Sequence, residues 1–329
     1  MRELGINQHD PHAQLRVSPL NLFKAFTLCV ERARGHHFPF ALGENFGRRF
    51  YVEIVTDGRG YSATQVEYRI TSWLALLGTV FAFTRYQQAM DVYEQAILIC
   101  SLPAVIWLAW FWRPLRTLML VVTGLSLLAI YLYQGDLARS EQVFLLKYFL
   151  SSQSAILWMS MLFFISTVFY WAGVFIRGQA DAMESLGSRM AWVAVGLALI
   201  GTLVRWYESH QLGPDIGHIP VSNLYEVFIM FCWMTAAFYL YYEAQYKTRA
   251  LGAFVMLVVS AAVGFLLWYT LVREAHEIQP LVPALKSWWM KLHVPANFIG
   301  YGTFALAAMV SFAYLIKQQA TETRWYKLA

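Results

Sequence analysis

The histidines indicate where this chain could bind a metal ion or a haem iron, because neutral imidazole is a common ligand for both. None of the eight histidines lies inside an apolar run free of charged residues. They fall in the N-terminal segment and in two later loops: His9, His12, His36, His37, His210, His218, His276 and His293. A membrane cytochrome that holds haem between two intramembrane histidines is therefore excluded, and any such chemistry is expected at the loops.

The loop that ends at His293 combines this histidine with aromatic residues. Residues 284–293 have helical spacing and predict an amphipathic helix at the membrane interface. Trp288 and Trp289 precede His293 by five and four residues, so Trp289 shares its face and Trp288 lies close by. Imidazole suits an iron ligand and indole planes suit a flat ring system, but a Trp pair is also typical of an interfacial anchor. Both interpretations remain.

The loop over residues 205–226 is rich in proline and glycine, which predict an irregular backbone. Ser222 or Asn223 is expected to cap the helix that follows, with Glu226 in its first turn. In the alternative interpretation, these three polar residues form the floor of a polar site.

Cysteine content and charge exclude further classes of protein. Cys29, Cys100 and Cys232 are far apart and form no C-x-x-C pair, so a thiol–disulfide relay, a thiolate metal site and covalent haem attachment to this chain have no support. The formal net charge of +5 is mild and dispersed along the chain, and we expect no nucleic-acid partner.

The elements that position these loops are predicted to be membrane helices. Apolar and aromatic residues make up 58% of the 329 residues and charged residues 14%, against about 25% in a soluble domain. This composition predicts an all-α polytopic integral membrane protein in a lipid bilayer, with about eight transmembrane helices plus amphipathic interfacial helices. The uncharged runs are residues 70–84, 95–112, 117–135, 148–176, 190–204, 227–242, 250–272 and 294–316.

The chain divides into three parts by its composition. Residues 1–69 are predicted to be a cytoplasmic segment with an amphipathic helix, residues 70–144 to hold the first transmembrane helices, and residues 145–329 to form a further membrane domain. No signal peptide is expected, because Lys24 interrupts the early apolar stretch. If successive loops lie on opposite sides of the membrane, most of the 25 Lys and Arg fall on the same side as both termini. Because Lys and Arg are enriched in cytoplasmic loops, both termini are predicted to be cytoplasmic.

Three stretches carry a family resemblance: residues 149–158 (FLSSQSAILW), 220–226 (PVSNLYE) and 278–294 (IQPLVPALKSWWMKLHV). Through them, residues 145–316 resemble the CcsA/ResC-type cytochrome c biogenesis proteins, the haem-handling membrane subunits of a system that attaches haem to c-type cytochromes. The resemblance implies that residues 145–329 are a cytochrome c assembly domain in the cytoplasmic (inner) membrane of a bacterium.

The resemblance also implies a site and partners. In this family an external pair of histidines holds haem iron and a tryptophan-rich segment cradles the porphyrin; His293 matches the first histidine of the pair, and Trp288 and Trp289 are the aromatic residues beside it. The matching stretch 220–226 also implies a role for its motif residues Pro220, Ser222, Asn223 and Glu226. The implied cofactor is b-type haem, bound non-covalently and transiently. The implied partners are a ResB/Ccs1-like membrane protein and apocytochrome c, whose C-x-x-C-H thiols add to the haem vinyl groups.

The sequence departs from the family pattern in its tryptophan-rich segment. No W-x-W-D core is found, and we expect that the chain lacks the C-terminal part of the family. Two functions therefore remain, a subunit of a cytochrome c haem lyase and a non-catalytic scaffold or haem-conducting subunit. No catalytic residue is assigned, and a second iron ligand from His210, His218 or His276 is not favoured. A small-molecule transporter has no positive support in the sequence.

Overall fold

The computed structural model describes residues 63–322 except 177, 214–215, 282 and 284–285. Within these residues every regular element is a helix, as the composition predicts. The helices described below lie in the compact unit Thr64–Ala329, except that the first of them begins one residue earlier, at Ala63. The amphipathic helix expected in residues 1–62 lies outside the described residues.

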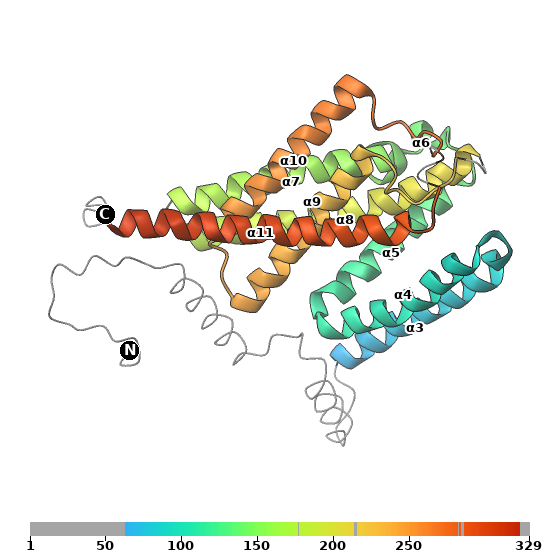
Figure 1. The fold of residues 1–329 in the computed structure, drawn as a ribbon, viewed down its shortest axis with the longest axis horizontal. Helices are drawn as coiled ribbons and strands as arrows, with labels where there is room; N and C mark the ends of the chain where they lie inside the picture. The colour runs from blue at the N-terminus through green and yellow to red at the C-terminus, as the bar shows by residue number, and fades with distance from the viewer. Residues whose placement is uncertain (1–62, 177, 214–215, 282, 284–285, 323–329) are drawn as a thin grey trace, which may run out of the picture. The chain divides into compact units, whose positions relative to one another are not determined.

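Seven helices of the described chain are long and apolar enough to cross a membrane. They are α4 (Val92–Phe111), α5 (Arg113–Tyr133), α7 (Ser152–Phe175), α8 (Ala180–Leu212), α9 (Leu224–Tyr246), α10 (Gly252–Arg273) and α11 (Met290–Glu322), the last through its part Met290–Ile316. The short helix η2 (Gln87–Ala89) precedes α4, and two more, α6 (Arg139–Gln142) and η3 (Leu146–Leu150), lie between α5 and α7. Figure 1 shows the long helices, with α11 extending beside the others.

The sequence predicts about eight spans and the described structure has seven candidates, because α3 (Ala63–Tyr86) is not among them. Although α3 has 24 residues, its uncharged run, residues 70–84, has only 15, because Arg69 and Arg85 bound it. A spanning helix needs about 20 apolar residues, so the apolar run of α3 is short for a span.

Local signals set where the helices begin and end. Asp91 forms a capping box with Glu94 at the start of α4, and Ser151 caps α7. Lys247 and Glu274 adopt the left-handed conformation just after α9 and α10. These ends satisfy backbone groups that a helix terminus otherwise leaves without partners.

The prediction of an amphipathic helix over residues 284–293 is wrong about where the helix begins. Residues 286–289 are described as irregular or turn, and α11 begins at Met290. The cause is Ser287, whose hydroxyl accepts a hydrogen bond from Trp289 N at 3.3 Å and whose carbonyl accepts one from Met290 N at 3.2 Å. Such a local turn ends the irregular segment and starts the helix.

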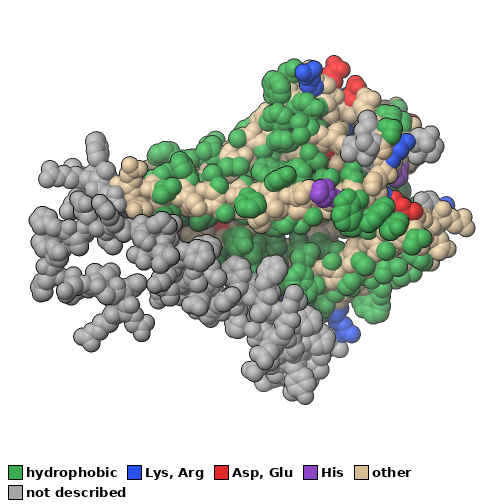
Figure 2. Space-filling model, viewed as in Figure 1, with side chains coloured by type: hydrophobic (Ala, Val, Ile, Leu, Met, Phe, Trp, Pro, Cys, Tyr) green, Lys and Arg blue, Asp and Glu red, His purple; other side chains and the backbone are tan. Residues whose placement is uncertain are grey.

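The core of the bundle lies among α7, α8, α9 and α10, where buried residues such as Phe163, Val195, Tyr239 and Met256 pack together. Small residues allow α7 and α8 to approach closely. A Cβ on Gly201 would lie 2.9 Å from Cγ1 of Ile156 and 3.3 Å from the carbonyl oxygen of Ser152. Figure 2 shows hydrophobic side chains over most of the visible helix surface, as expected for helices that face lipid.

The close approach of α7 and α8 predicts the effect of Gly201→Ala. The added methyl group overpacks the contact and should lower the free energy of unfolding by about 1–3 kcal/mol. The measurement is thermal unfolding in detergent, followed by the reaction of the buried thiol of Cys232 with a fluorogenic maleimide after Cys29 and Cys100 are replaced by serine. The control is Gly124→Ala, where nothing lies within 4 Å of the new Cβ. Equal destabilisation by both variants would contradict the prediction.

Candidate functional site

A buried ion pair joins α8 to α9. Nε of Arg205 lies 2.8 Å from Oε1 of Glu226, and both side chains are 2% exposed. The Arg205 guanidinium also lies over the ring of Tyr225, 5.1 Å from its centroid. Removing one partner of such a pair leaves a buried charge without compensation and costs about 3–5 kcal/mol. The pair therefore fixes the position of α9 against α8.

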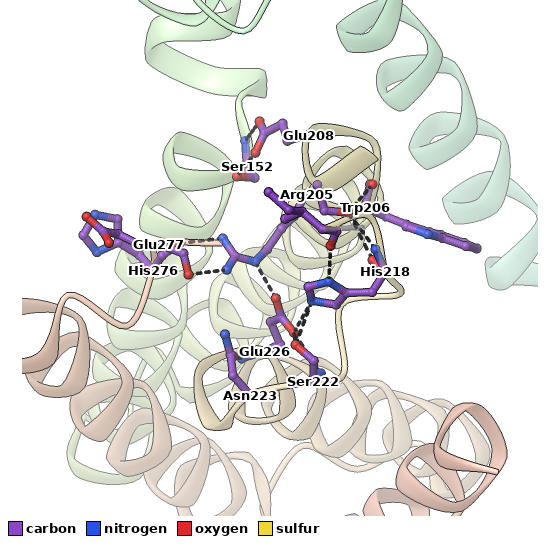
Figure 3. A network of polar contacts seen from close by, with 12 residues as sticks. Ser152, Arg205, Trp206, Glu208, His218, Ser222, Asn223, Glu226, His276 and Glu277 are labelled. Carbon is purple, nitrogen blue, oxygen red and sulfur yellow. Dashed lines mark hydrogen bonds and ion pairs between the residues drawn. The ribbon is translucent and has the colours of Figure 1, made fainter. Parts of the chain in front are cut away.

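Arg205 also binds the segment that connects α10 to α11. Its Nη1 donates to the carbonyl of His276 at 2.7 Å, and its Nη2 lies 3.4 Å from the carbonyl of Glu277. Figure 3 shows the guanidinium between this segment on one side and Glu226 on the other. A single arginine thus connects two loops that are separated by more than fifty residues in the sequence.

Glu226 uses its second oxygen to hold the loop before α9. Oε2 accepts hydrogen bonds from the backbone N and the hydroxyl of Ser222, at 2.9 and 2.8 Å. The Ser222 hydroxyl also lies 2.8 Å from Nε2 of His218, whose Nδ1 is 2.6 Å from the carbonyl of Ile216. Ser209 on α8 adds hydrogen bonds to the backbone of His218. The carboxylate, the hydroxyl and the imidazole form one continuous polar network (Figure 3).

The motif residues predicted from sequence take distinct places in this network. Asn223 is the N-cap of α9, since its Oδ1 accepts from Glu226 N at 2.8 Å. Pro220 is buried beside them. Ser222 and Glu226 belong to the buried hydrogen bonds described above. The structure therefore brings Ser222, Asn223 and Glu226 together at the start of α9, and it decides the cap in favour of Asn223.

The sequence interpretation missed a second buried carboxylate, Glu208, one turn after Arg205. It accepts from the hydroxyl of Tyr133 at 2.6 Å, from Ser152 N at 3.0 Å and from the Ser152 hydroxyl. These bonds tie α8 to the end of α5 and the start of α7. The sequence signal for this residue was its spacing from Arg205: two charged residues three positions apart near the end of a long apolar run. Charged residues at such places are often buried and paired.

The loop that the network holds packs against the start of α11. Val221 is buried with Met290 and Met230, and Val294 and Phe298 pack against the same cluster. Met290, Val294 and Phe298 repeat at four-residue spacing and so lie on one face of α11. Residues 220–223 therefore support the turn of α11 that carries His293.

His293 itself points away from that packed face and is exposed. The indole of Trp289 lies with its centroid 6.3 Å from the imidazole at an interplanar angle of 21°, and Nδ2 of Asn297 lies 2.9 Å from Nε2. Trp289 is 55% exposed. The structure thus brings Trp289 and His293 together on an open face of the helix.

Trp288 takes a different direction and contacts α4. Its ring stacks on Tyr93 with centroids 4.4 Å apart at 3°, and it meets Trp289 edge-on at 84°. Beside it Lys291 forms an ion pair with Glu94. A shallow apolar groove of about 420 Å³ between α4 and α11 is lined by Tyr93, Ala96, Ile97, Cys100, Ser101, Trp288 and Leu292. Trp288 therefore anchors α11 to α4 in this structure, while Trp289 stays beside the histidine.

The other loop histidines do not gather around His293. His218 is buried in the polar network, and His210 is exposed and packs against Gly217. His276 contributes its carbonyl to Arg205, and its Nδ1 is buried without a hydrogen bond. Within the described residues no group of three His, Cys, Asp or Glu side chains is placed to hold a metal ion.

These features define a multi-pass helical membrane protein whose helix ends are joined by a buried polar network beside an open histidine. Residues 221–329 match the family model described as cytochrome C assembly protein. About half of the chain is homologous to CcsA proteins of cytochrome c biogenesis.

The relatives include the cytochrome c biogenesis protein CcsA of Gloeobacter violaceus, 35% identical over 164 residues, and that of Chlorella vulgaris, 31% identical over 160 residues. A third, the CcsA of Cyanophora paradoxa, is 33% identical over 154 residues. These matches cover 49%, 47% and 46% of this chain and 46%, 47% and 44% of the respective relatives. The chain thus spans about half the length of the curated relatives it matches. No solved structure matches it.

The buried pair predicts a pattern of stability in a double-mutant cycle. Arg205→Met and Glu226→Leu should each lower the free energy of unfolding by about 3–5 kcal/mol, because each leaves one buried charge unpaired. The double variant should recover part of that loss, since no uncompensated charge remains. The measurement is the Cys232 unfolding assay described above. Additive losses in the double variant would contradict coupling between the two side chains.

Proposed function

We propose that this protein handles haem at the outer face of a membrane for covalent attachment to the C-x-x-C-H motifs of apocytochrome c. The observation that carries the proposal is the exposed imidazole of His293, stacked by Trp289, within the part of the chain that matches the cytochrome c assembly family model. Haem is the cargo of this reaction, and no residue of this chain is assigned a catalytic role.

The donor set beside His293 suits haem. A neutral imidazole is a good axial ligand for iron, and an adjacent indole offers a flat apolar surface for a macrocycle. Among the described residues no second histidine contacts this ring. We therefore assign His293 as one axial ligand of b-type haem, bound without a covalent link, and assign the second ligand to a group outside the described residues, such as the histidine of the substrate motif.

The attachment itself makes two carbon–sulfur bonds. Each thiol adds across one vinyl group, so that sulfur bonds to the carbon next to the ring and hydrogen to the terminal carbon, with no net transfer of electrons. The protein contributes position: it holds the haem at a fixed place while the substrate thiols approach. Trp289 would hold the plane of the imidazole, and Trp288 would hold the helix through its stack on Tyr93.

The motif residues support this site from the opposite face of α11. Arg205, Glu226 and Ser222 fix the loop that places Val221 against Met290, one turn before His293. Pro220 and Asn223 shape the same loop. In this proposal they position the ligand helix and do not touch haem.

The charge distribution supports the placement of this site. If α3 crosses the membrane as an eighth span, most Lys and Arg lie on the side opposite the loops that hold Arg205 and His293, which favours an outer position for these loops in a bacterial cytoplasmic membrane and cytoplasmic termini. A ResB/Ccs1-like membrane protein and apocytochrome c are the partners that this function requires.

A second candidate function is a scaffold or haem-conducting subunit without a complete site. The observation that favours it is that His210, His218 and His276 lie elsewhere in the described structure, so His293 has no second histidine beside it. Such a subunit would supply helices and a first ligand and would leave attachment to another chain.

The role of His293 predicts the haem content of the purified protein. After mild detergent extraction, the protein should carry haem in the pyridine haemochrome assay. His293→Gly should lose most of it and regain part on addition of imidazole, which replaces the missing ligand. His210→Ala, an exposed histidine of another loop, is the control and should retain the wild-type content. Equal haem in the wild type and in His293→Gly would remove His293 from the site.

Complementation separates the two candidate functions. These 329 residues should be expressed with a ResB/Ccs1-like partner and a reporter apocytochrome in a strain that lacks its own assembly system. If the chain takes part in attachment as proposed, haem-stained gels of the reporter will show covalent haem, and the His293→Gly variant will not. A reporter without covalent haem, beside a purified chain that still binds haem, would favour the conducting subunit.

A further inference from the structure

The groove of about 420 Å³ between α4 and α11 is lined by groups that offer water few hydrogen bonds. Its lining includes the rings of Tyr93 and Trp288 and the aliphatic side chains of Ile97 and Leu292. Ser101 lines it too, but its hydroxyl donates to a carbonyl of its own helix at 2.8 Å. Ordered water needs two to four polar partners, so this lining favours an apolar occupant.

The groove continues a surface that faces lipid. The structure describes every residue of α4, and Ala109 is the one that is buried, although α4 is long and apolar enough to cross a membrane. Apolar side chains of both helices outside the groove are exposed as well, such as Ile99 on α4 at 54% and Ile299 on α11 at 47%. In a multi-pass membrane protein such surfaces are in contact with hydrocarbon. The occupant of the groove therefore comes from the bilayer.

Size and charge favour a hydrocarbon chain over a charged headgroup. An apolar cavity of about 150 Å³ holds one benzene molecule, so about 420 Å³ has room for a chain of roughly seventeen carbon atoms at the same packing. Next to Leu292, Lys291 forms an ion pair with Glu94 of α4, and the two charges compensate each other. This pair favours neither an acidic nor a basic headgroup, so the chain is the part of a lipid that the groove can recognise.

We propose that the groove between α4 and α11 is a binding site for one acyl chain of a membrane phospholipid, selected by its chain and not by its headgroup. Within a bilayer the gain comes from close packing and not from exclusion of water, so a groove that fits a chain holds it more firmly than the convex surface of a single helix. The bound chain supports the first turns of α11 from the side of α4, because Leu292 and Trp288 both contact it. This site does not depend on the role proposed for His293.

The test uses the full-length protein in nanodiscs that contain phosphatidylcholine with a photoreactive diazirine in one acyl chain. After illumination, mass spectrometry of peptides locates the cross-linked residues. Cross-links should concentrate on groove residues such as Ala96 and Leu292, and should exceed those around Ala307, an exposed residue about four turns further along α11. The same diazirine chain on a phosphoglycerol headgroup should give the same pattern.

Two variants fill the groove from α4. Ala96→Phe and Ser101→Leu should each remove most of the cross-links in the groove, because the added side chain occupies the space of the acyl chain. Both positions are exposed, so the packed face of the bundle stays intact. Ala307→Phe is the matched control: it adds the same side chain to the exposed surface of α11 and should leave the groove cross-links at the wild-type level. The Cys232 unfolding assay checks that each variant is folded.

Equal cross-linking in the groove and around Ala307, or wild-type cross-linking in both groove-filling variants, would show unselective contact with lipid and overturn the proposal. Loss of the groove cross-links with the phosphoglycerol lipid would overturn selection by the chain. Displacement of the lipid by haemin would assign the groove to haem and overturn the proposal as well. None of these outcomes alters the separate test of haem content in His293→Gly.

Discussion

The buried contact between Arg205 and Glu226 is the interaction on which the arrangement of the loops depends. A guanidinium presents its donors in a fixed plane, and here those donors are divided between one carboxylate and two backbone carbonyls. The carboxylate in turn has one oxygen for the arginine and one for Ser222. Because a buried charge is tolerated only with such partners, neither loop can move away without leaving a charge uncompensated.

This constraint reaches His293 through apolar packing. Ser222 holds the loop segment that contains Val221, and Val221 packs against Met290 in the first turn of α11. On the other side, Arg205 holds the chain that leads from α10 into α11. The first turn of α11 is therefore supported from both directions. A ligand-bearing side chain can then be exposed on a helix that remains fixed, which is what binding of a rigid planar molecule requires.

Much of the fold could be predicted from the sequence, because membrane helices are set by long apolar runs that need no tertiary information. A cap at Ser222 or Asn223 followed from local rules for helix termini, and the structure decides for Asn223. Arg205 and Glu208 could not be found this way: each stands at the end of an apolar run, where a charge is equally consistent with an exposed loop. Their burial depends on α5, α7 and α9 meeting at one place, and no local pattern encodes that meeting.

The pair Trp288–Trp289 also shows what sequence spacing cannot predict, namely which neighbour each side chain contacts. Spacing placed both near His293, yet the two residues lie in the turn that leads into α11, and their side chains contact different neighbours. Trp288 meets Tyr93 on α4, and Trp289 meets the imidazole. Close packing and the ion pair between Lys291 and Glu94 hold one face, buried residues hold a second, and only the third face remains open. The open face carries His293 because the other two are occupied, so the exposure of this histidine follows from how α11 is packed.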